Sequence, residues 1–496
     1  MRSTGLLLNI SSLPNKFGIG GFGDECNRFV DLLSNAQCKW WQILPLTTIG
    51  LGNSPYSGVS AFAGNYLYVD PEKLYKNGYI NSEQYNEAIY YNQPYSVDYE
   101  WTAKSKKKLI EFAYKNCIEK ESTELYEFMT YHRDWLLDYA LYMTIKDMFD
   151  GKAWFEWPDE YKYRNEETLS KLIEDKNYRL YYYVCEQMLF NKQWQECKEY
   201  ANKRGIGIIG DMPIYVAHDS VDVWANPELF QLDKNLVPKK VAGVPPDYFC
   251  EEGQLWGNPI FDYKTMEKDS YYWFQKRFER MFELYDKLRI DHFRAFDRYW
   301  AVDYGAENAI NGSWEKGPGI KFFDIMKKKF PNADIIAEDL GVIDDGVIKL
   351  LEKTGFPGMR VLQFAFDGGN SPHLPHNFNK NSVVYTGTHD NNTTYGWISE
   401  LSDDARLKLF DYVGEFGELE GGENSKQIWA CIRCLLTSSA DTVIIPFQDF
   451  AGWGGDTRMN KPGVAEGNWQ IRITDEVLNK VRVDKLRRYN YLSSRI

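Results

Sequence analysis

The sequence has few cysteines, no long hydrophobic run and no excess of positive charge. Eight cysteines in 496 residues are too sparse for a disulfide scaffold, so we expect reduced thiols. No stretch approaches the roughly 20 apolar residues of a membrane span. The 58 basic and 71 acidic residues give a net charge of −13, which argues against nucleic acid or an anionic membrane as the main partner.

The N-terminal apolar run Leu6–Leu8 could be mistaken for a signal sequence. It is broken at Asn9 and no small-residue cleavage site follows, so we do not expect export. Together with the low cysteine content, this predicts a soluble, cytoplasmic protein.

Hydrophobic residues make up 44% of the chain, and many of them fall in eight short runs bounded by turn residues. Near-continuous hydrophobicity of this kind is typical of strands that are covered on both faces, as in a parallel sheet. The runs lie at 5–12, 39–46, 206–216, 287–295, 334–341, 359–366, 382–390 and 441–449.

Helical periods lie between most of these runs, at 24–36, 270–286, 321–330, 344–354 and 426–440. Strands and helices that alternate to a count of eight predict a (β/α)8 TIM barrel, which we expect to span residues 1–496 as a single catalytic domain. Two gaps are too long for simple crossovers. We interpret 72–200 as an inserted, mainly helical subdomain and 217–269 as a loop-rich insertion that borders the active site.

Four carboxylates lie at or near the C-terminal ends of predicted strands, namely Asp211, Asp291, Glu338 and Asp390. Active sites of barrels lie at that end, so we expect the four side chains to converge. A single Asp after a strand more often caps a helix, but four such residues favour a catalytic site. Arg289 shares a strand face with Asp291, and we expect both to line a solvated mouth rather than the core.

Paired carboxylates without an obvious metal cluster suggest glycosidic chemistry, in which one carboxylate attacks the sugar and a second carboxyl acts as acid and then base. Arg289 would keep Asp291 ionised, which suits a nucleophile. Glu338 follows an apolar run and is suited to hold a proton near neutral pH. Asp390 and His389 could bind sugar hydroxyls.

The sequence also resembles a known family, the 4-alpha-glucanotransferases of glycoside hydrolase family 77, called amylomaltases or disproportionating enzymes. Several long motifs carry the resemblance in order along the chain. They are SSLPNKFGIGGFG (11–23), WWQILPL (40–46), NSPYSGVSAFAGN (53–65), GDMPIYVA (210–217), GQLWGNPIFDY (253–263), LRIDHFRAF (288–296), IIAEDLG (335–341), YTGTHDNNTT (385–394) and RMNKPGVAEGNWQIR (458–472).

The resemblance implies retaining transfer of α-1,4-glucan segments between maltodextrins, with glucose or another α-1,4-glucan as acceptor and with no metal or other cofactor. By motif position, Asp291 is the nucleophile, Glu338 the general acid/base and Asp390 the transition-state stabiliser. The same matching suggests that substrate is contacted by Tyr56, Asp211, Trp256, Arg289, His389 and Asn460.

Three other features allow alternative interpretations. Gly18–Gly23 fits a dinucleotide-binding pattern, but it is separated from the preceding strand and no acidic residue closes a second strand, so we disfavour nucleotide binding. Cys431–Cys434 is a lone C-x-x-C pair within a helical period, where packing is favoured over metal or redox chemistry. His292 points to the opposite strand face from Asp291 and is interpreted as a structural group.

Two alternative functions remain beside a glucanotransferase: a retaining α-glucan hydrolase with the same three carboxylates, and a non-catalytic dextrin-binding protein. The aromatic content of 16% suits carbohydrate binding, although most rings belong to the core. Tyr56 and Trp256 are the exceptions, since each is expected in a loop rich in Gly, Pro and Asn. A binding protein needs no acid/base pair, so the carboxylates favour an enzyme.

Overall fold

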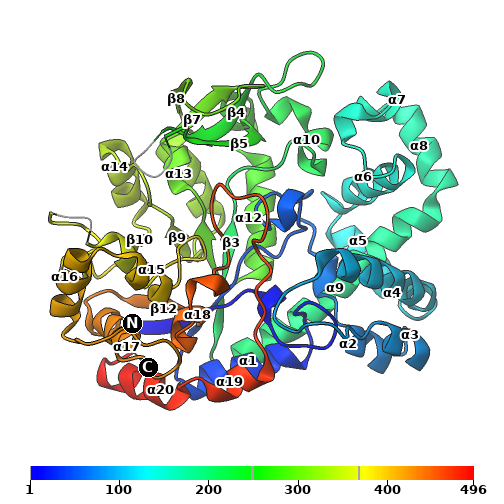
Figure 1. Cartoon of the computed structure of the whole chain (residues 1–496). Helices are drawn as coiled ribbons and strands as arrows, with labels where there is room; N and C mark the ends of the chain where they lie inside the picture. The colour runs from blue at the N-terminus through cyan, green and yellow to red at the C-terminus, as the bar shows by residue number, and fades with distance from the viewer. Residues whose placement is uncertain (1, 247–250, 367–368, 496) are drawn as a thin grey trace.

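A closed barrel of eight parallel strands forms the centre of the molecule (Figure 1), in the order β1-β12-β11-β10-β9-β6-β3-β2. The computed structural model describes residues 2–246, 251–366 and 369–495. Each strand overlaps one of the eight predicted runs, which confirms the (β/α)8 barrel. The strands are β1 Ser3–Leu7, β2 Trp40–Gln42, β3 Gly207–Met212, β6 Lys287–Ile290, β9 Ile335–Ala337, β10 Gly358–Val361, β11 Ser382–Tyr385 and β12 Thr442–Pro446.

A small apolar cluster fills the inside of the barrel, and a much larger one lies between the strands and the surrounding helices. The inner cluster consists of Leu7, Ile209, Ile336, Met359, Val361, Val383, Tyr385 and Ile444. These residues come from six of the eight strands, so the barrel interior below the mouth is packed rather than open.

Helices form over all five predicted helical periods. They are α1 Asp24–Asn35, α12 Tyr272–Leu284, α13 Gly319–Lys329, α14 Asp345–Thr354 and α17 Lys426–Thr437. The C-terminal part of the chain adds α15 Thr394–Glu400, α16 Asp403–Val413, α18 Phe447–Ala451, α19 Asp475–Lys480 and α20 Val483–Leu492. Helix α20 packs against α1 and α17, which brings the end of the chain next to its first barrel helix.

The segment between β2 and β3 is mainly helical and lies to one side of the barrel (Figure 1). Its helices are α2 Pro71–Lys76, α3 Ser82–Glu87, α4 Tyr99–Lys120, α5 Ser122–Tyr131, α6 Leu136–Met148, α7 Asp159–Lys162, α8 Glu166–Asp175 and α9 Asn177–Lys203. Helix α9 contacts α4, α5, α6 and α8 of this segment and also α1 and α12 of the barrel. Its Trp194 indole donates a 3.0 Å hydrogen bond to the carbonyl of Leu284.

The segment 217–269, which we predicted to be loop-rich, contains the short strands β4 Lys240–Val244 and β5 Gln254–Pro259 and the short helices α10 Val221–Ala225 and α11 Tyr263–Lys268. Residues 247–250 lie outside the described chain. The two strands join β7 Arg298–Asp303 and β8 Gly312–Lys316 in an antiparallel sheet of order β5-β4-β7-β8. We did not predict this sheet, because its strands are short and its two neighbouring pairs are joined only by the long-range pairing of β4 with β7.

The glycine run and the cysteines have structural roles. Residues 18–23 are buried, and a Cβ on Gly20 would lie 1.9 Å from the carbonyl oxygen of Ile10, so close packing requires a glycine there. Cys431 and Cys434 lie in α17, and burial raises the pKa of both thiols. Seven cysteines of the described chain are free, and Cys250 lies outside it.

Among the helices of the described residues, none has both the length and the apolar character needed to cross a membrane.

Candidate active site

The alternation of side chains along the strands places two of the predicted carboxylates at the inner top of the barrel. Ile209 and Ile336 belong to the core inside the barrel. Asp211 and Glu338 each lie two residues further along, so they share that inward face at the C-terminal ends of β3 and β9. Arg289 is the register partner of Asp211 on the neighbouring strand β6.

Arg289 joins two carboxylates. Its Nη1 donates to Asp211 Oδ2 at 2.5 Å, and its Nη2 lies 3.1 Å from Asp291 Oδ1. The prediction that Arg289 lines a solvated mouth is wrong, since Arg289 is 3% exposed and Asp211 1% exposed. The buried charges are tolerated because they are paired with one another, not because water reaches them.

Asp291 follows directly after β6 and keeps 27% of its side chain exposed. Burial in the mouth raises the pKa of Asp291 to about 6, against the opposing effect of Arg289. The nearby carboxylates of Asp211 and Asp390 raise it further. Asp291 is therefore mainly ionised at neutral pH, as we expected for a nucleophile.

Glu338 has the opposite preference. Burial raises the pKa of Glu338 to about 8, and the nearby charge of Asp291 adds to the rise, whereas Arg289 lowers it. The carboxyl is fixed by two backbone donors: the amide of His292 donates to Oε2 at 2.6 Å and the amide of Leu340 to Oε1 at 3.1 Å. At neutral pH Glu338 thus holds a proton while Asp291 is mainly ionised.

Tyr56 connects the strand residues with the loop after β11. Its hydroxyl donates to Asp211 Oδ2 at 2.8 Å, and its ring stacks on the His389 ring with centroids 5.2 Å apart and planes 10° apart. Tyr56 lies in a turn outside any strand or helix, as predicted. His389 is buried, and burial lowers the pKa of its imidazole, so the ring is neutral at pH 7.

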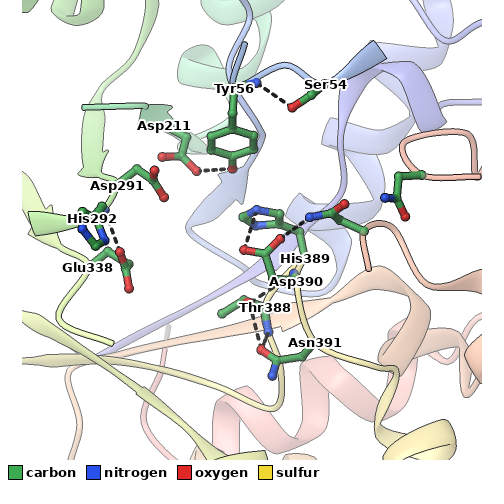
Figure 2. A network of polar contacts seen from close by, with 12 residues as sticks. Ser54, Tyr56, Asp211, Asp291, His292, Glu338, Thr388, His389, Asp390 and Asn391 are labelled. Atoms are coloured by element: carbon green, nitrogen blue, oxygen red, sulfur yellow. Dashed lines mark hydrogen bonds and ion pairs between the residues drawn. The ribbon is translucent and has the colours of Figure 1, made fainter. Parts of the chain in front are cut away.

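Asp390 lies on the opposite side of the mouth from Glu338 (Figure 2). Asn460 Nδ2 donates to Asp390 Oδ1 at 2.6 Å, and His389 Nε2 lies 3.2 Å from Asp390 Oδ2. The side chain is nevertheless 43% exposed. Figure 2 shows the carboxyls of Asp211, Asp291, Glu338 and Asp390 around one common space, as we expected from the positions of these residues at strand ends.

Trp256 reaches the cluster from the small antiparallel sheet. The expectation that it lies in a loop is wrong, because it belongs to β5, where its side chain is 37% exposed. Its ring packs edge-on against His292 with centroids 4.8 Å apart. His292 follows Asp291 in the chain, and its amide donates to Glu338, so it links Trp256 to the other predicted site residues. All nine predicted site residues therefore belong to one connected cluster.

Three further residues contribute that we did not assign to the site. The His292 amide holds Glu338, in a left-handed backbone conformation with φ of 49°. Arg458 donates to the Asp390 carbonyl, and the Trp469 ring lies 5.8 Å from the Tyr56 ring. All three occur within quoted motifs, but no local pattern distinguishes them from structural neighbours.

No group of three or more His, Cys, Asp or Glu side chains within the described parts of the chain is arranged to hold a metal ion.

Comparisons with known proteins identify the family of this chain. The model of glycoside hydrolase family 77, described as 4-alpha-glucanotransferase, matches residues 8–478. A 4-alpha-glucanotransferase of Aquifex aeolicus is 44% identical over 97% of both chains, and one of Clostridium butyricum is 42% identical over 98% of this chain and all of the relative. An amylomaltase of Streptococcus agalactiae, solved in complex with acarbose, is 39% identical with a TM-score of 0.96 and full coverage of both chains.

Proposed function

This chain belongs to the 4-alpha-glucanotransferases of glycoside hydrolase family 77, and on that premise we propose which residues carry out the transfer of α-1,4-glucan segments. Asp291 is the nucleophile, Glu338 the general acid/base and Asp390 the transition-state stabiliser. The donor is a maltodextrin, and the acceptor is glucose or a second maltodextrin. Neither nucleic acid nor a membrane is a partner in this proposal, and the enzyme acts in the cytoplasm.

In the first step, Glu338 donates its proton to the glycosidic oxygen as that bond breaks, and the shortened sugar leaves with a new 4-hydroxyl. Asp291 attacks the anomeric carbon from the other side of the ring and forms a glycosyl ester. Arg289 stabilises the ionised nucleophile beforehand, at 3.1 Å from its carboxylate. The pKa of about 8 explains how Glu338 carries a proton at neutral pH.

In the second step, Glu338 is the base. It removes the proton from the 4-hydroxyl of the acceptor, whose oxygen attacks the anomeric carbon and releases Asp291. Two inversions give net retention, so the new bond is again α-1,4. Asn460 and His389 hold the carboxylate of Asp390 in place. This carboxylate accepts hydrogen bonds from sugar hydroxyls, and these bonds strengthen as the sugar ring flattens in each transition state.

One observation supports this assignment above the others. Asp291 and Glu338 face the same space, and their pKa values of about 6 and about 8 lie on either side of neutrality. A nucleophile and an acid need this separation, whereas a non-catalytic dextrin-binding protein needs neither.

Incubation of the purified protein with maltotriose alone tests the function. We expect glucose together with maltopentaose and longer chains, with little change in total reducing ends, because each transfer conserves the number of chains. Chromatography of the products and a reducing-end assay measure this. Rising reducing ends with only shorter products would instead indicate the α-glucan hydrolase, and unchanged maltotriose would contradict the proposal.

A further inference from the structure

A cavity of about 540 Å³ lies between α5, α9 and α12, outside the candidate active site. Glu283 of its wall lies near the end of α12, four residues before β6 begins. The cavity therefore borders the N-terminal ends of the barrel strands, whereas the catalytic carboxylates lie at the C-terminal ends. We propose that this cavity is a second binding site for a segment of an α-glucan. The choice of glucan rests on the proposed function.

Aromatic rings form one wall of the cavity. Phe128 and Tyr131 of α5 and the adjacent His132 pack edge to face, with ring centroids 4.5 Å apart for Phe128 and His132 and 4.8 Å apart for Tyr131 and His132. Tyr131 is 67% exposed although it is a large ring, so it offers an apolar face that the protein itself leaves uncovered. Flat apolar faces of this kind suit the C–H faces of a sugar ring.

His132 supplies an unused polar group in the same wall. Its side chain is only 6% exposed, and its ring nitrogens have no hydrogen-bond partner within the described part of the chain. Burial, with a smaller effect of Arg280, lowers the pKa of His132 to about 3, so the ring is neutral. A neutral imidazole has one donor and one acceptor, and a sugar hydroxyl can satisfy either.

The carboxylates around the cavity do not need a bound cation to balance their charge, because four of them already form ion pairs with basic side chains. The pairs are Glu124 with Lys192 at 3.1 Å, Glu283 with Arg280 at 2.9 Å, Glu196 with Lys73 at 2.7 Å and Glu199 with Lys203 at 3.1 Å. Ion-paired carboxylates still accept hydrogen bonds through their remaining lone pairs. The lining therefore favours a neutral ligand with many hydroxyls.

The volume also fits a short oligosaccharide, since it falls within the roughly 300–1,000 Å³ of typical small-molecule sites. If the cavity held one part of a long glucan, the free end of the same chain would be present at a raised effective concentration at the active site. A short substrate cannot occupy both sites. The second site should thus lower KM for long glucans and leave maltotriose unaffected.

The variant Tyr131→Ala tests the proposal, with Tyr126→Ala as its control. Tyr126 lies on the same helix and is 71% exposed, but it does not line the cavity. We expect Tyr131→Ala to raise KM for amylose about tenfold, a loss of about 1.4 kcal/mol, with kcat and the kinetics on maltotriose unchanged. Tyr126→Ala should match the native enzyme on both substrates.

Calorimetry measures binding without turnover, in the Asp291→Asn background. Maltoheptaose should show a binding event that Tyr131→Ala weakens about tenfold and Tyr126→Ala does not. Equal isotherms for the two variants would overturn the proposal. The proposal would also be overturned if the native cavity bound spermidine but no glucan, and if Tyr131→Ala abolished that spermidine binding. A failure of the proposed function would be seen in a different experiment, as maltotriose that the native enzyme leaves unchanged. Binding of maltoheptaose could still be measured in that case.

Discussion

Arg289 is the residue on which the electrostatics of the site depend most. It is buried in the barrel wall and pairs with both Asp211 and Asp291, so one cation offsets two carboxylates that lie at the inner end of the mouth. Burial alone would lower the pKa of Arg289. The charges of Asp211 and Asp291 outweigh this effect, so the pKa of Arg289 lies above its usual range. The guanidinium therefore stays charged whenever the enzyme is folded, and it holds Asp291 ready for attack.

The substitution Arg289→Met should lower the free energy of unfolding by about 3–5 kcal/mol, because it leaves the buried carboxylate of Asp211 without its charged partner. Denaturant unfolding measures the change. The control is Arg298→Met, where the side chain is 60% exposed and its ion pair with Asp297 spans 3.9 Å. We expect the control to stay within about 0.5 kcal/mol of the native protein. Equal losses for the two variants would contradict the role given to the buried pairs.

At the scale of elements, the barrel supplies the reacting carboxyls and the sheet β5-β4-β7-β8 supplies the ring that covers them. Trp256 of β5 touches His292, whose amide fixes Glu338. The indole Nε1 donates to Gln254 of the same strand at 3.1 Å. Within the described residues the ring belongs to none of the core clusters and is 37% exposed, so it can contact a sugar.

The substitution Trp256→Ala should raise KM for long maltodextrins about tenfold, which corresponds to about 1.4 kcal/mol. Its effect on thermal stability should be small, since the ring is 37% exposed. Trp314→Ala is the matched control, because Trp314 is equally exposed on β8 at the far edge of the same sheet. A large fall in melting temperature without a change in KM would identify Trp256 as a core residue.

The sequence predicted the barrel because its strands are covered on both faces and are therefore nearly continuous runs of apolar residues. It also located the carboxylates, since a charged residue at the end of such a run is easily recognised. It did not predict the sheet around Trp256, whose strands are short and partly exposed and whose two halves meet only through the long-range pairing of β4 with β7. Nor did it predict that Arg289 is buried, because that depends on Asp211, which lies 78 positions away in the sequence.

For the whole molecule, the two perturbed carboxyls predict how activity depends on pH. Asp291 must be ionised, so kcat/KM should fall as the pH drops through about 6. Glu338 must be protonated, so kcat/KM should also fall as the pH rises through about 8. A profile on maltotriose should therefore peak between these values, with the two groups titrating as an interacting pair.

Substitution separates the two limbs of this profile. Glu338→Gln should reduce kcat by about 10²–10⁴-fold and remove the alkaline limb, because the amide cannot titrate. The neighbouring Asp339→Asn is the control: Asp339 bonds Arg360 at 2.8 Å and lies outside the cluster, so the alkaline limb should remain. Near-native turnover of Glu338→Gln, or an alkaline limb that persists in it, would contradict the acid/base role.

Trapping of the glycosyl-enzyme tests the central claim most directly. An α-maltosyl fluoride needs no acid to leave, so Glu338→Gln should still form the ester and then lack the base that resolves it. Mass spectrometry should find one added maltosyl group, on the peptide that contains Asp291, and none when Asp291→Asn is added. An adduct on another residue, or free product of inverted configuration without any adduct, would contradict the account.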